Sequence, residues 1–161
     1  MAPIATMAYS VVGQDLLVFV AGIAEPTAAE WLEYQRRIEP LVRRIRSDGG
    51  TIKFLVIADE GGPNAKQRAA IADMLHGITT RTAVVSNSMI ARRMITAFGW
   101  LNFAMKGFAP NQVAAAGAYL DLSTEQLQTV VARAAALAQS IGGVRCVVAA
   151  VEAMKSGGVP R

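Results

Sequence analysis

The stretch TIKFLVIADEGGPN, residues 51–64, decides the fold of this chain. Residues 51–58 are rich in β-branched and aromatic side chains, as in a strand buried on both faces. The acidic pair Asp59–Glu60 ends that strand. Glycines that allow positive φ and a proline follow, and Asn64 is a good cap for a helix. The stretch therefore predicts a strand, a turn and a helix.

Two strands and a long helix precede this stretch. The segments MAYSVV (7–12) and LLVFVAGI (16–23) alternate or run apolar, and a glycine-containing tight turn joins them. Thr27 and Glu30 have the spacing of a capping box, which predicts a helix from about residue 28 onward. That helix connects the second strand to the third, so we expect a parallel pair with a right-handed crossover.

Pro40 lies inside this long predicted helix. Proline lacks the backbone N–H that a helix needs and its ring crowds the preceding turn. We therefore expect a kink or a break at Pro40.

Strand and helix patterns continue to alternate after the opening stretch. The alternation predicts a mixed α/β sheet flanked by helices. The expected elements are a helix at 65–78, a strand at 81–86, a helix at 88–102, a short strand at 103–109 and a helix at 111–122.

Residues 123–161 have a different pattern, with two apolar stripes at helical spacing separated by Gly142–Gly143. We expect a domain over 1–122 and a C-terminal helical hairpin extension packed on it. Valine is a poor helix former, so a strand over 144–151 is the alternative. The second stripe could also bring two copies of the chain together, forming a homo-oligomer. Its members are Val144, Val147, Val148, Val151 and Met154.

The composition indicates a single globular domain. The chain has 161 residues, of which 53% are hydrophobic and 17% charged, with a formal charge of +4. Its arginines are spread over two predicted helices without interleaved aromatic residues, which favours solvated helix faces over a nucleic-acid surface. The most apolar late stretch contains Gln139, Arg145 and Glu152, so we expect no membrane span and a cytoplasmic protein.

The residues that usually carry catalysis are scarce. Cys146 and His76 are the only cysteine and the only histidine, which excludes an internal disulfide, a cysteine zinc site and a histidine-pair metal site. No glycine-rich phosphate loop is present. We therefore expect no cofactor, no metal and no enzymatic activity.

Phosphotransfer is the one catalytic chemistry that the spacing suggests. Asp59, Ser86 and Lys106 lie at or near the ends of three successive predicted strands, the order found in receiver domains. A receiver also needs an acidic pair after its first strand for Mg²⁺, and this chain offers only Glu25 there. A single β-α unit precedes Asp59 where a receiver has two, so an active receiver is disfavoured.

A cluster of methionine and aromatic residues forms the second candidate site. Core packing explains such a cluster, but it also suits an apolar ligand pocket or a partner groove. The residues are Met94, Phe98, Trp100, Phe103 and Met105.

The segments RTAVVSNSMIARRMITAF (81–98), FAMKGF (103–108) and QVAAAGAYLDL (112–122), in this element order, resemble the STAS-like domains. These include bacterial anti-anti-sigma factors and small STAS/SEC14-type proteins, and the resemblance covers residues 7–122. It implies a mixed sheet flanked by helices and regulation through protein contacts. In that family the loop after the third strand can carry a phosphorylatable serine.

The corresponding loop here, ADEGGPNAK, has no serine or threonine, so that switch cannot be carried over. Asp59 and Glu60 could instead supply a constant negative charge. We expect a non-enzymatic signalling module with a protein partner; the alternative is a carrier or sensor of an apolar or lipid-like ligand. The predicted partner surface consists of Asp59, Glu60, Gly61, Gly62, Asn64 and Lys66.

Overall fold

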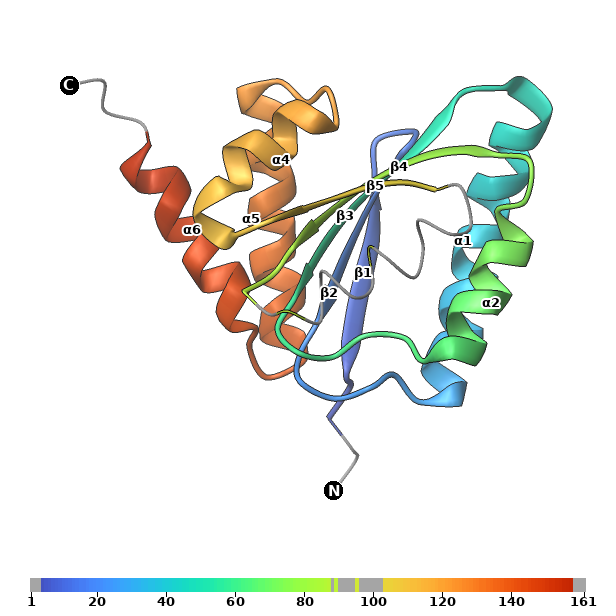
Figure 1. The fold of residues 1–161 in the computed structure, drawn as a ribbon, viewed down its shortest axis with the longest axis horizontal. Helices are drawn as coiled ribbons and strands as arrows, with labels where there is room; N and C mark the ends of the chain where they lie inside the picture. Colours follow the sequence, from blue (N-terminus) through green and yellow to red (C-terminus); the bar gives the residue numbers. More distant parts are fainter. Residues whose placement is uncertain (1–3, 88, 90–94, 96–102, 158–161) are drawn as a thin grey trace.

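The computed structural model describes residues 4–87, 89, 95 and 103–157. These residues form three layers, in which a mixed sheet lies between two groups of helices (Figure 1). The expected α/β architecture is confirmed. The predicted helix at 88–102 falls almost entirely outside the described residues.

The sheet has the strand order β1-β2-β3-β4-β5. β1 pairs with β2 in antiparallel orientation, and all later neighbours are parallel, as the predicted crossovers require. Since successive parallel strands point the same way, the loops that follow β2 and β3 and the residues directly after β4, Ser86 and Asn87, lie at one end of the sheet. The strands are β1 (Met7–Val12), β2 (Leu16–Ala21), β3 (Thr51–Ala58), β4 (Thr79–Val85) and β5 (Ala104–Phe108).

Helices α1 (Ala28–Asp48) and α2 (Ala65–Met74) cover one face of the sheet (Figure 1). The predicted capping box of α1 is present, since Thr27 Oγ1 accepts from the backbone of Glu30 and the Glu30 carboxylate accepts from Thr27 N. Helix α1 continues through Pro40, so no break occurs there. Pro40 is exposed, which lets the carbonyl that loses its helical donor turn toward water. Helix α2 ends earlier than its predicted limit.

The opposite face is covered by α4 (Val113–Tyr119), α5 (Thr124–Ser140) and α6 (Arg145–Ser156), with the 3₁₀ turn η1 (Pro110–Gln112) before α4. The alternative for residues 144–151 is thereby resolved in favour of a helix. Side chains of α5 and α6 belong to the same core cluster as the strand residues beneath them. That cluster includes Val18, Val20, Leu55, Ile57, Val130, Ala134, Val144 and Val147.

The valine stripe of α6 points largely into this core. Val144 and Val147 are buried and Val151 and Met154 are partly buried, whereas Val148 is 57% exposed. Most of the stripe therefore packs within the chain, and Val148 is its one exposed member. None of the helices within the described ranges is long and apolar enough to cross a membrane.

Candidate functional site

The β3–α2 loop, residues 59–64, lies against the β2–α1 loop at the carboxyl end of the sheet. Asp59 N donates to Ala21 O over 3.1 Å, and Gly61 N donates to Gly22 O over 2.7 Å. A Cβ atom on Gly61 would lie 2.3 Å from Ala24 O and 2.6 Å from Gly22 O. Glycine is thus required at position 61 by the close approach of two backbones, and its φ does not lie in the left-handed region.

Asn64 holds the start of α2 and joins it to the neighbouring loop. Its Oδ1 accepts from Gln67 N over 2.9 Å, and its own N donates to Gln67 Oε1 over 3.0 Å. Asn64 Nδ2 also donates to Glu25 Oε1 over 2.6 Å. Buried Gln67 then donates to Pro26 O over 2.9 Å. Gln67 was not predicted as a site residue, although the Asn-x-x-Gln spacing of a capping box could have revealed it.

Asp59 has a role inside the fold. Its Oδ2 accepts from Arg145 N and its Oδ1 from Cys146 N, each over 2.9 Å. These are the first two backbone amides of α6, whose own N-cap residue, Val144, has no side-chain acceptor. The carboxylate at the end of β3 therefore caps α6 and opposes the positive end of its dipole.

Of the six residues predicted for partner contact, Glu60 and Lys66 have exposed side chains. Gly61 is buried, and Asp59 and Asn64 are only partly exposed and hydrogen-bonded as described above. The loop thus presents the acidic side chain of Glu60, and the first turn of α2 presents the basic side chain of Lys66.

A hollow of about 520 Å³ lies next to this loop, between the β2–α1 loop and the α5–α6 turn, and its lining is mostly apolar but includes Thr6 and Arg145. Ile4 (74% exposed), Ile23 (73%) and Val148 line it together with Asp59. Across the described part of the chain, six large hydrophobic side chains are exposed, and these three are half of them. Exposed apolar side chains that gather at one place commonly mark a contact surface.

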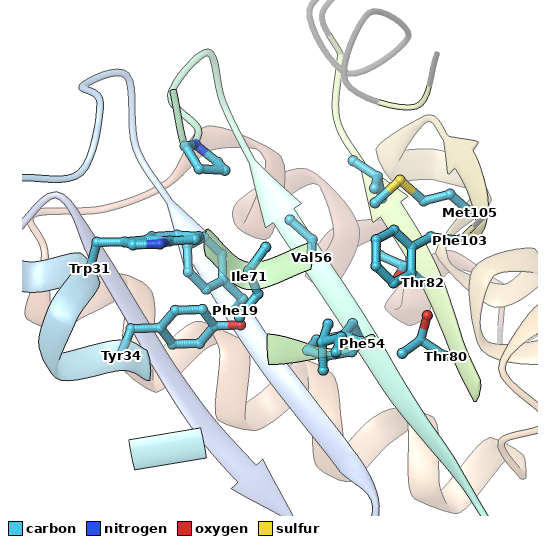
Figure 2. A pocket seen from close by; sticks show the side chains of 13 residues that line it. Phe19, Trp31, Tyr34, Phe54, Val56, Ile71, Thr80, Thr82, Phe103 and Met105 are labelled. Atoms are coloured by element: carbon cyan, nitrogen blue, oxygen red, sulfur yellow. The ribbon is translucent and has the colours of Figure 1, made fainter. Parts of the chain in front are cut away.

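A second, smaller cavity of about 80 Å³ lies on the other face of the sheet, where α1 and α2 pack (Figure 2). Phe103 and Met105 from the predicted methionine and aromatic cluster line it. Met94, Phe98 and Trp100 of that cluster are outside the described residues. Most of the lining comes from α1, α2 and the strands, which the sequence pattern did not connect with this cluster. It includes Phe19, Trp31, Tyr34, Phe54, Thr80 and Thr82.

A family model described as SpoIIAA-like matches residues 18–121, which is more than half of the chain. This chain belongs to the SpoIIAA-like family. No curated protein and no solved structure gave a significant match. The SpoIIAA-like fold is a regulatory one, of the type found in anti-sigma-factor antagonists, and such domains are typically non-enzymatic. The matched span ends before α5 begins.

The side chains of Asp59, Ser86 and Lys106, considered above for phosphotransfer, make other contacts in this SpoIIAA-like fold. Both carboxylate oxygens of Asp59 accept from α6, and Ser86 is buried with its hydroxyl donating to Asp59 O over 3.1 Å. Lys106 Nζ lies 5.6 Å from the centre of the Phe108 ring. Among the described residues, no group of three or more acidic, cysteine or histidine side chains could hold a metal ion.

Cys146 is buried beside the Asp59 cap. Burial is the largest cause that raises the pKa of its thiol above the ordinary value, and the Asp59 carboxylate adds to it, against a backbone hydrogen bond from Asn87 that lowers the pKa. Since the thiolate is the reactive form, both burial and the raised pKa suppress reaction.

We expect iodoacetamide at neutral pH to alkylate Cys146 in the folded protein at least about 100-fold more slowly than in the urea-unfolded chain. Mass spectrometry of timed samples measures the ratio. Equal rates in the two states would contradict the buried position of the thiol.

Proposed function

We propose that this SpoIIAA-like chain is a regulatory module that acts by binding another protein. The proposed contact surface, called here the docking edge, consists of Ile4, Ile23, Glu60, Lys66 and Val148. The single observation that carries the proposal is the gathering of three exposed apolar side chains around one hollow beside the β3–α2 loop.

The chemistry of the docking edge suits a protein partner. Its apolar side chains can be covered only by an apolar surface, and desolvated apolar anchors supply most of the affinity in protein interfaces. Glu60 lies at the edge of the same loop and selects a partner with a basic side chain facing it. The partner's contact region is therefore expected to combine aliphatic or aromatic residues with a lysine or arginine.

Asp59 and Glu60 are the two residues of the β3–α2 loop that could supply the constant negative charge expected there. The β3–α2 loop holds no hydroxyl residue that a kinase could modify, and the Asp59 carboxylate is used to cap α6. We propose that the constant negative charge presented to a partner comes from Glu60. Glu60→Ala alone tests this idea, since changing Asp59 would also disturb α6.

We predict that Ile23→Asp weakens capture of the partner from lysate of the native cells by at least about tenfold. The physical reason is that a charged side chain at the centre of the apolar contact loses its hydration without gaining a counter-charge. Quantitative pull-down with the wild-type chain as bait, followed by titration of the captured protein, measures the loss.

Leu32→Asp is the matched control, because Leu32 is also an exposed leucine-sized residue, at 51%, but belongs to α1 and does not line the hollow. Capture should be unchanged in this variant. Equal capture by the wild type and Ile23→Asp would refute the docking edge. Sedimentation of wild type and Val148→Asp across a concentration range would show instead whether the covering partner is a second copy.

A further inference from the structure

Strand β1 lies at a border of the sheet, where it has β2 as its only neighbouring strand in the sheet order. The backbone groups of β2 alternate in direction, because Ala21 O accepts from Asp59 N on the β3 side and Gly22 N donates to Thr6 O on the β1 side. The register pairs even-numbered residues of β1 with even-numbered residues of β2. The even-numbered residues of β1 therefore bond to β2, and the odd-numbered ones direct their backbone groups away from the sheet.

The outward-directed residues are Met7, Tyr9 and Val11. Within the described parts of the chain, their N–H groups have no acceptor, and the one contact to their carbonyls is from the Ser10 hydroxyl to Val11 O, over 3.5 Å. A row of unpaired donors and acceptors of this kind is a template for pairing with another strand.

The sequence of β1 does nothing to prevent such pairing. Natural sheets usually protect a border strand with a charged side chain, a proline or a bulge. The segment MAYSVV has neither charge nor proline, and its register with β2 runs unbroken from Met7 to Val12, so it has no bulge. By contrast, β5 at the other border carries the exposed side chain of Lys106. The two borders thus differ in the way expected if β1 is the one that pairs.

We propose that β1 pairs with β1 of a second copy of this chain, in antiparallel orientation, so that the two sheets continue into each other. A two-fold axis at Tyr9 brings the two Tyr9 residues together and places Met7 of each copy opposite Val11 of the other. This register uses every outward-directed residue and forms about six hydrogen bonds between the copies. It also covers part of the Val11 side chain, which is 42% exposed, and it brings aromatic and aliphatic pairs together across the strands.

Helix α1 runs alongside β1 in the same direction. Near the start of β1, the Thr6 hydroxyl donates to the Glu30 carboxylate over 2.7 Å, and beyond its end Arg44 donates to Gln14 O. Residues 30 and 44 are separated by about four helical turns, so they lie on one flank of α1. That flank is the side of the helix nearest to the free border of β1.

Glu33 and Arg37 lie on the same flank, one turn apart and both exposed, with Arg37 Nε donating to Glu33 Oε1 over 2.8 Å. Burial is the largest cause that raises the pKa of the Tyr9 hydroxyl; Glu33 adds to it and Arg37 opposes it, which places both charges near Tyr9. An axis at Tyr9 runs the two α1 helices antiparallel, so Glu33 of each copy lies opposite Arg37 of the other. This charge complementarity favours a second copy over an unrelated strand.

The inference goes beyond the proposed docking function and is independent of it. None of Met7, Tyr9 and Val11 belongs to the docking edge or lines its hollow. Ile23→Asp and Val148→Asp should therefore leave the dimer intact, and loss of the dimer should leave capture of the protein partner unchanged. Failure of one proposal can thus be told from failure of the other.

The first test is sedimentation of the full-length chain over about 5–500 µM, where we expect a reversible dimer. Val11→Lys places a charge at the strand border and should raise the dissociation constant at least about tenfold. Leu32→Lys is the matched control, because Leu32 is exposed on α1 but lies on another flank, and it should leave the dimer unchanged. A monomer at every concentration, or equal dimerisation of Val11→Lys and the wild type, would overturn the proposal.

The charges on α1 allow a test of the two-fold axis itself. Glu33→Arg gives a chain with two adjacent cations on this flank, and Arg37→Glu gives one with two anions, so each should dimerise at least about fivefold more weakly than the wild type. A mixture of the two variants should form the mixed dimer, because the cations of one face the anions of the other. The ion pair within α1 is lost in both variants, so preferential mixing reports on contact between copies. Two variants that remain monomeric when mixed would contradict the axis at Tyr9.

Amide hydrogen exchange identifies the strand directly. The amides of Tyr9 and Val11 should exchange slowly in the dimer and at least about tenfold faster on dilution to the monomer, whereas those of Ala8 and Ser10, which face β2, should change little. A dimer in which dilution leaves all four amides equally protected would place the contact elsewhere. Protection of Tyr9 and Val11 that appears only after addition of lysate from the native cells would assign β1 to a different protein and likewise refute the proposal.

Discussion

A chain that ends at Leu122 is expected to remain unfolded, although it contains all of residues 18–121, which the family model matches. The truncation removes α5 and α6, which help to cover one face of the sheet, together with the turn between them. The removed residues include Val130, Ile141, Val144 and Val147 of the core. Each buried aliphatic side chain of this size contributes about 1.5–3 kcal/mol. Their loss is comparable to the net stability of a domain, about 5–15 kcal/mol, before the newly exposed strand residues are considered.

Circular dichroism and the dispersion of the amide proton spectrum measure this outcome. A substitution pair makes the same test in the full-length chain: Val130→Asp, at a buried position of α5, should unfold the protein, whereas Ala132→Asp, at an exposed position of the same helix, should not. Cooperative thermal unfolding of the 1–122 chain would show that the sheet does not need α5 and α6 as its cover.

Asp59→Ala is expected to lower the free energy of unfolding by about 2–4 kcal/mol. The change removes two charge-assisted hydrogen bonds to the amides of Arg145 and Cys146, and it leaves the N-terminal dipole of α6 without its counter-charge. For a chain of this length, such a loss corresponds to a fall in melting temperature of about 5–15 °C. Thermal and urea unfolding measure both quantities.

Two further variants separate the cap from a general effect of charge. Asp59→Asn keeps one acceptor but no charge, so it should lose about half as much stability as the alanine variant. Asp73→Ala removes an exposed carboxylate from α2 and should cost no more than about 0.5 kcal/mol. A loss for Asp59→Ala no larger than that for Asp73→Ala would show that Asp59 does not hold α6.

The same variant has a local consequence at Cys146. Since Asp59 binds the amide of this residue, its removal should free the first turn of α6 and speed alkylation of the thiol. The stability and reactivity measurements therefore report on one contact between β3 and α6.

The sequence was a good guide to the elements of the fold. The apolar runs at 7–12, 16–23 and 51–58 and the Thr27–Glu30 spacing each correspond to the observed element. These signals depend on side chains within a few residues of one another, which is why they can be read from the chain itself. Of the kink or break expected at Pro40, the break did not occur, because an exposed helix face can lose one internal hydrogen bond to water.

The candidate sites were less predictable. Asp59 was singled out because it ends a strand, but its hydrogen-bond partners lie 86 and 87 residues away and no local pattern connects them. Gly61 was assigned to a turn, whereas its smallness is needed against Ala24 and Gly22 of another loop. Both roles arise from contacts between segments that only the packed sheet brings together.

The sequence by itself determined the order of strands and helices, the SpoIIAA-like character of the core, and the absence of a hydroxyl residue from the β3–α2 loop. Only the tertiary structure decided that α5 and α6 complete the core and that Asp59 caps α6. The two groups of features differ in how far apart along the chain the residues that produce them lie. Periodicity and caps are local properties of the backbone, whereas a cap from another element or a cavity wall depends on which distant segments the sheet places side by side.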